Sequence, residues 1–381
     1  MLKRWVRGAV LVLAVLAAGL IGAAPGASSL PISTGGCPAP PPSVAAGPIS
    51  LTVTNRAALF AAVYLINPAG AVFAEIPSLT PGKSLPLATT LGAGTYRLRC
   101  VFTDNTVRDS AAFTVTGTTS GAVTGYRAVP DLALAGPVGA YRNWVRAALP
   151  GLLAASQTLA ADVAAGDLAK ARADWLTAHL DYERLGAAYN SFGDFDDAIN
   201  GRADGLPKGT ADPDWTGFHA IEYALWHGGS ATQLAALTGK LVNSVNGLIA
   251  DFPSEEVDPG DLPLRAHEIL ENAMQFQLTG LADYGSATTL ATTYANTQGT
   301  EEVVSVLAAL ITPRDPGLLP TITSGLARVQ ADLLAARSAT GVWTAPANLP
   351  LAQRQRLDGD LGELLEHLSV LPDLLAPRTF G

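Results

Sequence analysis

The chain has 381 residues, with 33 acidic and 24 basic side chains, and its formal net charge is −9 at neutral pH. This length is enough for two domains with separate hydrophobic cores. An acidic surface repels nucleic acid and anionic lipid and mildly favours cations, so we expect no nucleic-acid partner.

The first 28 residues carry the pattern of a secretory signal peptide. Lys3, Arg4 and Arg7 precede an apolar run over residues 9–21, and small residues follow it. The run is too short to cross a bilayer comfortably, and nothing downstream is long and apolar enough to be a membrane helix. We therefore predict that residues 1–28 are a signal peptide and that the mature protein is exported, to a periplasm, a cell surface or the extracellular medium. Without the signal the net charge is 21 − 33 = −12.

Export bears on the two cysteines of the chain, Cys37 and Cys100. Exported proteins meet an oxidising environment, so we predict a disulfide between them. A copper site with a Cys100 thiolate is the sharper alternative. No lipid is expected on Cys37, because the residues just before it lack the branched apolar side chain of a lipoprotein signal and the apolar run lies too far upstream.

Residues 45–117 have the pattern of a small β-sandwich. Short β-type segments are separated by turn residues, for example at Asn67–Gly70, as in sandwich domains. The segment GTYRLRC, which ends at Cys100, resembles the last strand of cupredoxin-like domains. A blue-copper centre needs two imidazoles beside the thiolate, and no His precedes His179. We therefore expect a structural or docking module without a blue-copper centre.

A linker rich in Gly and Thr is predicted at residues 118–130. Beyond it, residues 131–377 have apolar side chains at helical spacing, broken by Pro and Gly. The strongest pattern covers residues 167–189, where an apolar stripe follows one helix face. Helices of this length joined by short connections form bundles, and sites in bundles are built from facing helices. The predicted fold is therefore an all-β sandwich followed by an all-α bundle.

The segment WTGFHAIEYALWHGG, residues 215–229, carries His219 and Glu222 about one helical turn apart on one face. An imidazole and a carboxylate on one face share a cation, or serve as a base and its partner. Apolar neighbours at core-facing spacing place the pair beside a packed interface, where an uncompensated charge is costly. A His–Glu hydrogen bond on a helix surface is the plainer alternative, and the H-x-x-E pattern alone does not decide between them.

Two more predicted helices carry the same combination. His179 and Glu183 lie four residues apart, and so do His267 and Glu271, with Glu268 on the same face as Glu271. The second helix lacks the closing His of the zinc-protease motif H-E-x-x-H. Such pairs also stabilise helices locally, so both interpretations stay open.

Carboxylates with an imidazole and no thiolate suit iron, manganese, calcium or zinc. Both cysteines precede the helical region, which excludes a thiolate zinc site there. Asp194, Asp196 and Asp197 follow the helix at 167–189, but their spacing misses the EF-hand pattern, so a solvated acidic loop is expected. The chain has no nucleophile elbow, phosphate loop or dinucleotide fingerprint.

Residues 130–375 resemble the imelysin family, also classified as peptidase M75, and in particular its EfeO-type members that serve bacterial iron uptake. The resemblance depends on blocks that occur in order, WLTAHLDYERLGAAY, FGDFDDAINGRADGLP, DWTGFHAIEYALWHGG, RAHEILENAMQFQLTGLADYGS and TYANTQGTEEVVSVLAALITPRDPGL. A cupredoxin-like domain before an imelysin domain is also similar to the longer architecture of that group. The resemblance implies a double four-helix bundle with a metal site around H-x-x-E.

The matching positions imply metal ligands at Glu183, His219 and Glu222. Gly186 and Asn200 stand where many members of the family have an acid. Fewer carboxylates imply weaker binding, or a ligand set completed by Glu268 or Glu271. His179 is expected to hold a ligand in place without touching the metal.

This resemblance implies that the protein captures an iron ion, Fe2+ or Fe3+, and passes it to a membrane iron permease. A haem peroxidase of the same system is a candidate further partner, and another divalent metal is the alternative cargo. Two other classes of protein stay open. One is a metallopeptidase, for which the sequence offers no evident nucleophile, and the other is a structural or adhesive surface protein.

Overall fold

The computed structural model describes residues 29–127, 129–255 and 257–378. The predicted signal peptide, residues 1–28, lies outside them. The chain divides into two compact units, Met1–Gly125 and Tyr126–Gly381. The first unit is built from strands and the second almost wholly from helices, so the predicted order of a β domain followed by an α domain is confirmed.

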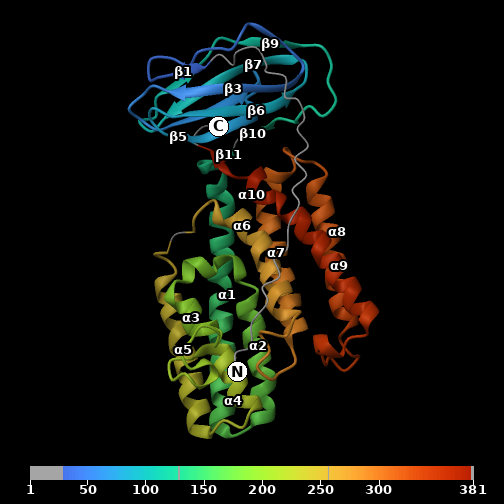
Figure 1. Ribbon diagram of the computed structural model, residues 1–381. Coiled ribbons are helices and arrows are strands. Elements are labelled where there is room, and N and C mark those ends of the chain that lie inside the picture. The colour runs from blue at the N-terminus through green and yellow to red at the C-terminus, as the bar shows by residue number, and fades with distance from the viewer. Residues whose placement is uncertain (1–28, 128, 256, 379–381) are drawn as a thin grey trace, which may run out of the picture. The chain divides into compact units, whose positions relative to one another are not determined.

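The β unit packs two sheets around one core (Figure 1). The smaller sheet has the order β1-β3-β6, and the larger has β5-β4-β7-β9-β2 with β8 beside β7. The strands are β1 Leu30–Ile32, β2 Ser43–Ala45, β3 Gly47–Asn55, β4 Ala61–Ile66, β5 Ala71–Leu79, β6 Ser84–Leu91, β7 Gly94–Phe102, β8 Val107–Asp109 and β9 Phe113–Thr116.

The hairpin of β4 and β5 closes at the turn that the sequence predicts. The Gly70 N–H donates to the Asn67 carbonyl at 3.0 Å, and the Asn67 side-chain oxygen accepts from the Ala71 N–H at 2.9 Å. Asparagine favours such turns because its side chain bonds to the backbone that follows it. The antiparallel pair β4 and β7 then places Val63 opposite Cys100 at the centre of the larger sheet.

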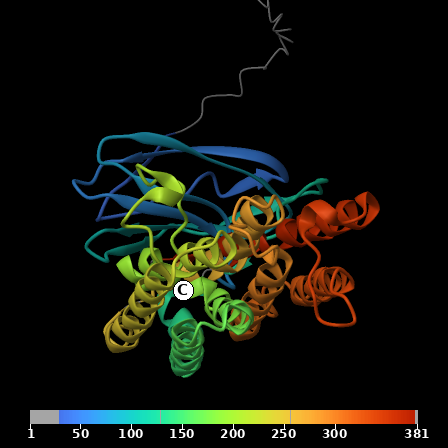
Figure 2. The same cartoon turned by 90° about the horizontal axis from the view of Figure 1, so that it is seen from below.

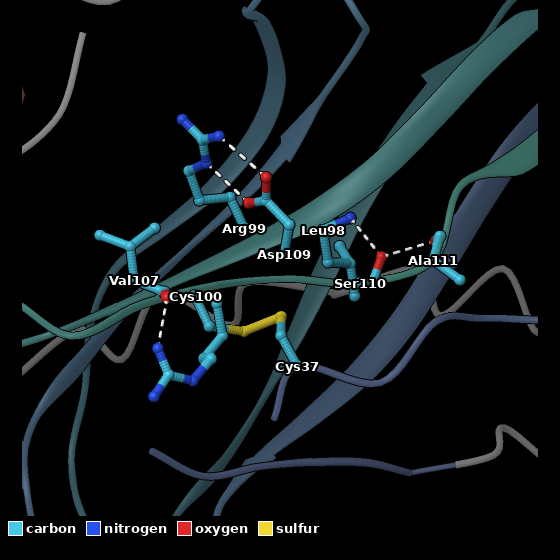
Figure 3. Close-up of a disulfide and its surroundings, with 9 residues drawn as sticks. Cys37, Leu98, Arg99, Cys100, Val107, Asp109, Ser110 and Ala111 are labelled. Atoms are coloured by element: carbon cyan, nitrogen blue, oxygen red, sulfur yellow. Dashed lines mark hydrogen bonds and ion pairs between the residues drawn. A yellow bond between two sulfur atoms is a disulfide. The ribbon is translucent and has the colours of Figure 1, made fainter. Parts of the chain in front are cut away.

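A disulfide joins Cys37, ahead of β2, to Cys100 on β7 (Figure 3). Both cysteines are buried, and because side chains alternate along a strand, the neighbouring Arg99 points the other way and bonds Asp109 at 2.7 and 2.9 Å. The bridge spans 63 residues, and closing a loop of this size contributes about 4 kcal/mol in the chain-entropy model. Since its sulfur is bonded to Cys37, Cys100 offers no thiolate to copper.

The helical unit consists of two groups of four helices. In one group α1 neighbours α2 and α5, and α4 neighbours both α2 and α5; in the other α6, α7, α8 and α9 neighbour one another in turn. Figures 1 and 2 show α8 and α9, in orange to red, on the far side of α7 from the green and yellow helices. The main helices are α1 Asp131–Ala165, α2 Leu168–Glu183, α4 Gly217–Trp226, α5 Ala231–Asp251, α6 Asp261–Asn272, α7 Thr289–Ile311, α8 Leu318–Ala335 and α9 Leu351–Leu368.

Shorter elements connect these helices. They are the helices α3 Asp194–Asn200 and α10 Val370–Leu374, the 3-10 helices Gly186–Phe192, Gly209–Ala211 and Pro346–Asn348, the π-helix Ala273–Gln277, and the strands β10 Tyr126–Arg127, β11 Val129–Pro130 and β12 Pro377–Arg378. In the part of the chain that the structure covers, no helix is both long and apolar enough to span a bilayer.

Local sequence signals fix the helices that matter for the site. The Asp167 side chain caps α2 by accepting from the Lys170 N–H at 3.1 Å. At the start of α4, Gly217 has a φ of +83°, and a Cβ there would lie 2.3 Å from the carbonyl oxygen of Ile199. Only glycine allows this approach, which packs the start of α4 directly against α3.

Candidate metal centre

A cavity of about 430 Å³ lies between α2, α3, α4, α6 and α7. Its wall includes the imidazole of His219 and the side chains of Asn200, Asn272, Gln277 and Asn296. Its charged residues are the acids Glu183, Asp196, Asp197, Asp204 and Glu268 and the bases Arg202 and Arg265. Acids outnumber bases, so the lining is net negative and attracts a cation.

Glu183, the last residue of α2, is 5% exposed. Its Oε1 lies 3.0 Å from His179 Nε2 and accepts a hydrogen bond from Asn200 at 2.9 Å, and its Oε2 accepts from Asn296 at 2.7 Å. Burial opposes ionisation of Glu183, but His179 and the two amides outweigh it and lower the pKa to about 2. Glu183 therefore presents a carboxylate at any physiological pH.

His219 and Glu222 of α4 are 2% and 1% exposed. Burial lowers the pKa of His219, against the opposing effect of Glu222, so its imidazole is neutral near pH 7. The Nδ1 atom lies 3.5 Å from Glu222 Oε2. A proton on Nδ1 leaves the lone pair of the ring on Nε2, where a metal is able to bind.

Glu222 lies behind His219 and does not line the cavity. Its Oε1 accepts from the backbone N–H groups of Tyr284 at 3.1 Å and Ser286 at 3.0 Å. Burial raises the pKa of Glu222, but bonding to His219 and Ser286 outweighs this and lowers it. The carboxylate thus faces the imidazole at 3.5 Å and anchors the loop before α7.

Contacts between aromatic rings hold α2 against α4. The rings of His179 and His219 meet edge to face with centroids 5.3 Å apart. The Trp175 indole N–H donates to the Phe218 carbonyl at 2.9 Å, and the Trp175 ring lies 5.0 Å from His179. The two His–Glu pairs predicted from the sequence therefore lie side by side.

The acidic segment after α2 is a helix and not the expected loop, although two of its three acids are exposed as expected. Asp194, Asp196 and Asp197 belong to α3; Asp194 and Asp197 are exposed, Asp196 is half-buried, and Asp196 and Asp197 line the cavity. Asp196 Oδ1 accepts from the Tyr182 hydroxyl at 2.5 Å. Burial, opposed by this bond and reinforced by the charge of Glu183, raises the pKa of Asp196 to about 6.

Of the two acids predicted as ligands on α6, only one lines the cavity. Glu268 lines the cavity and accepts a hydrogen bond from Arg265. Glu271 is outside the lining; its side chain is 45% exposed and lies 3.6 Å from His267. The structure therefore does not bring Glu271 to the other predicted ligands.

The C-terminal end of α6 continues as the π-helix Ala273–Gln277. This wider turn brings Phe276 and Gln277 to the cavity wall. Single π-turns are frequent at functional sites because they re-aim side chains within a helix. Neither residue was singled out from the sequence.

The donors at the cavity are carboxylates, amides and a neutral imidazole, which suit a hard or borderline ion such as iron. Three buried polar atoms of lining residues, Oδ1 of Asn200, Nε of Arg265 and Nδ1 of His219, form no hydrogen bond among the described residues; the Nδ1 atom has only the longer contact of 3.5 Å to Glu222. Over the same residues, no three His, Cys, Asp or Glu side chains approach closely enough to hold a metal ion without adjustment.

The fold and the cavity together define a class of protein: a β domain followed by a double helical bundle that gathers buried acids and imidazoles. Residues 137–369 match the model of the imelysin family, Peptidase_M75, and the chain belongs to this family. The resemblance inferred from the sequence blocks is confirmed.

Known relatives share most of the chain. The proteins named "Iron uptake system component EfeO" of Escherichia coli O157:H7, Escherichia coli K12 and Shigella flexneri are each 26% identical to it over 306 residues. The match covers 80% of this chain and 80% of each relative.

Proposed function

We propose that this protein is the metal-binding component of an EfeO-type iron-uptake system. It captures an iron ion in the cavity of the helical unit and passes it to a membrane permease, outside the cytoplasm. Its relatives are named as components of iron uptake systems. The observation that carries the proposal is that Glu183 and His219, buried side chains from separate helices, line one cavity as an ionised carboxylate and a neutral imidazole.

Each residue has a distinct part in this proposal. The Glu183 carboxylate and Nε2 of His219 would touch the ion, and Asp196, Asp197 or Glu268 would supply further oxygen atoms from the same wall. Glu222 would act through His219, because a partner on the second ring nitrogen fixes the orientation of a metal-binding imidazole. His179, whose Nε2 lies 3.0 Å from Oε1 of Glu183, would hold that carboxylate in place without touching the ion.

The exposed position of Glu271 gives it no part in holding the ion. The β unit, whose buried disulfide removes both thiols, would serve in docking to another component of the system. A membrane permease and a haem peroxidase are the proposed partners.

Anaerobic calorimetric titration with Fe2+ tests the proposal through a matched pair of variants. His219→Ala and His267→Ala each remove an imidazole that lies beside a Glu on its own helix. We expect His219→Ala to weaken iron binding at least about 100-fold, beyond the 10- to 100-fold that orienting partners contribute. We expect His267→Ala to bind within twofold of the parent. Equal affinities for both variants would remove the basis of the proposal.

A further inference from the structure

Two guanidinium groups line the proposed iron cavity, and capture of a bare cation gives them no role. Arg202 lies over the ring of Phe276, 3.8 Å from its centroid, and both donors that it uses go to a single oxygen of Asp204. Arg265 donates to Glu268 from Nη1. Both side chains are about three-quarters or more buried, at 25% and 21% exposed, so they are fixed parts of the wall.

Arg265 has one N–H group that no part of the described chain accepts from. Its Nε atom is buried and has no hydrogen-bond partner in the parts of the chain that the structure describes. A buried donor without a partner costs free energy, and at a cavity wall it is able to bond an acceptor that the chain does not supply, such as a water or an oxygen of a bound molecule. The planar fork of a guanidinium matches the two oxygen atoms of a carboxylate.

The size of the cavity agrees with a molecule larger than one ion. At about 30 Å³ of liquid volume per water, a cation with a shell of six waters occupies roughly 200 Å³. The cavity holds about 430 Å³, within the range of about 300–1,000 Å³ found for small-molecule sites.

The signs of charge also differ along the wall. Among the described residues, Glu183, Asp196 and Asp197 form no salt bridge with an arginine, although the charge of Arg265 acts on Asp196. These three acids attract a metal, whereas Arg202 and Arg265 repel one at close range. A ligand with a cation at one end and carboxylate oxygens at the other meets both parts of the wall with complementary charge.

We propose that the protein takes up its iron as a complex with a small carboxylate chelator. The metal faces Glu183 and His219, and the carboxylate of the chelator faces Arg265 and Arg202. This inference rests on the proposed function, because it names the form in which the same cavity receives its cargo.

Equilibrium dialysis of the mature protein with radiolabelled citrate tests this inference, with Ga3+ as a redox-inert substitute for Fe3+. We expect about one citrate to be retained for each bound Ga3+, and none without metal. Arg265→Gln and Arg202→Gln should each lower the citrate retained per bound metal ion at least about tenfold, because a charged hydrogen bond is lost. Arg202→Lys keeps the charge without the fork and should show an intermediate loss.

Arg328→Gln is the matched control, since Arg328 is ion-paired with Glu363 on the second helix group and is outside the cavity lining. It should retain citrate as the parent does, and circular dichroism confirms the fold of each variant. Retention of metal without citrate in the parent, or unchanged citrate retention in both Arg→Gln variants, would overturn the inference alone. If the parent binds neither Fe2+ by itself nor the Ga3+ complex, the proposed function fails with it.

Discussion

Helices α2 and α6 each carry a His and a Glu four residues apart, and the two pairs differ in how far they are buried. His179 and Glu183 on α2 are 3% and 6% exposed in their side chains and lie 3.0 Å apart. His267 and Glu271 on α6 are 22% and 45% exposed and lie 3.6 Å apart.

The difference comes from the surroundings of each acid. Glu183 accepts hydrogen bonds from Asn200 of α3 and Asn296 of α7, whereas Glu271 accepts from Gln275, four residues further along its own segment. Helical spacing puts an imidazole and a carboxylate on one face in both cases. Burial against other helices, and not helical spacing, therefore distinguishes the two pairs.

Replacing the acid of each pair should give the largest difference. We expect Glu183→Ala to lower the free energy of unfolding by about 3–5 kcal/mol, because it leaves buried partners without an acceptor. Glu271→Ala should cost about 0.5 kcal/mol or less, as is usual for an exposed residue. Urea unfolding followed by tryptophan fluorescence measures both, and similar losses for the two variants would contradict the comparison.

The pH dependence sharpens this prediction. The folded-state pKa of Glu183, about 2, lies below its ordinary value of 4.5, so ionisation of Glu183 stabilises the fold. That contribution is complete above about pH 4.5 and is lost as the pH falls through about 2. The difference between the parent and Glu183→Ala should therefore shrink below about pH 4.5.

Asp196 should show the opposite sign. Its pKa is raised from 3.8 to about 6, so its ionised form destabilises the metal-free protein at neutral pH. Asp196→Asn should raise the free energy of unfolding at pH 7 by roughly 2–3 kcal/mol. The gain should fade as the pH falls from about 6 towards 4, while iron binding at pH 7 weakens.

Asp194→Asn is the control for this prediction, because Asp194 is on the same short helix and is exposed. It should change the stability by about 0.5 kcal/mol or less. A stabilisation of the same size in both variants would show that the charge of α3 matters in general, and that the position of Asp196 at the cavity does not.

Glu222→Gln should have the smallest effect at the cavity. The amide oxygen still accepts from Tyr284 and Ser286, so we expect a loss of only about 1 kcal/mol in stability. Iron affinity should fall about 10- to 100-fold, because the imidazole of His219 loses its orienting partner. Calorimetric titration of Glu222→Gln and His219→Ala with Fe2+ compares their losses of iron affinity. A larger loss of iron affinity for Glu222→Gln than for His219→Ala would mean that Glu222 itself binds the ion.

The sequence predicts what local spacing determines. The shared faces of His219 with Glu222 and of His179 with Glu183 follow from helical geometry, and the change from β to helical periodicity gives the order of the two units. Asn296 lies 113 residues after Glu183 in the chain and donates to it from another helix, and no local sequence pattern predicts such a contact.

Other parts of the site depend on how helices rotate and end. Glu268 and Glu271 share a face by spacing, yet only Glu268 lines the cavity. Asp196 and Asp197 are on a helix of 7 residues, too short to show a clear period. Arg202 and Arg265 line the cavity only because of where the fold places them, and an arginine in the sequence does not by itself indicate such a position.

An anomalous difference map at the iron edge, from a crystal of the iron-loaded protein, tests the central claim most directly. We predict one peak inside the cavity, about 2.1 Å from a carboxylate oxygen of Glu183 and from Nε2 of His219. A peak against His267 and Glu271 or within the β unit, with the cavity empty of iron, would contradict the account.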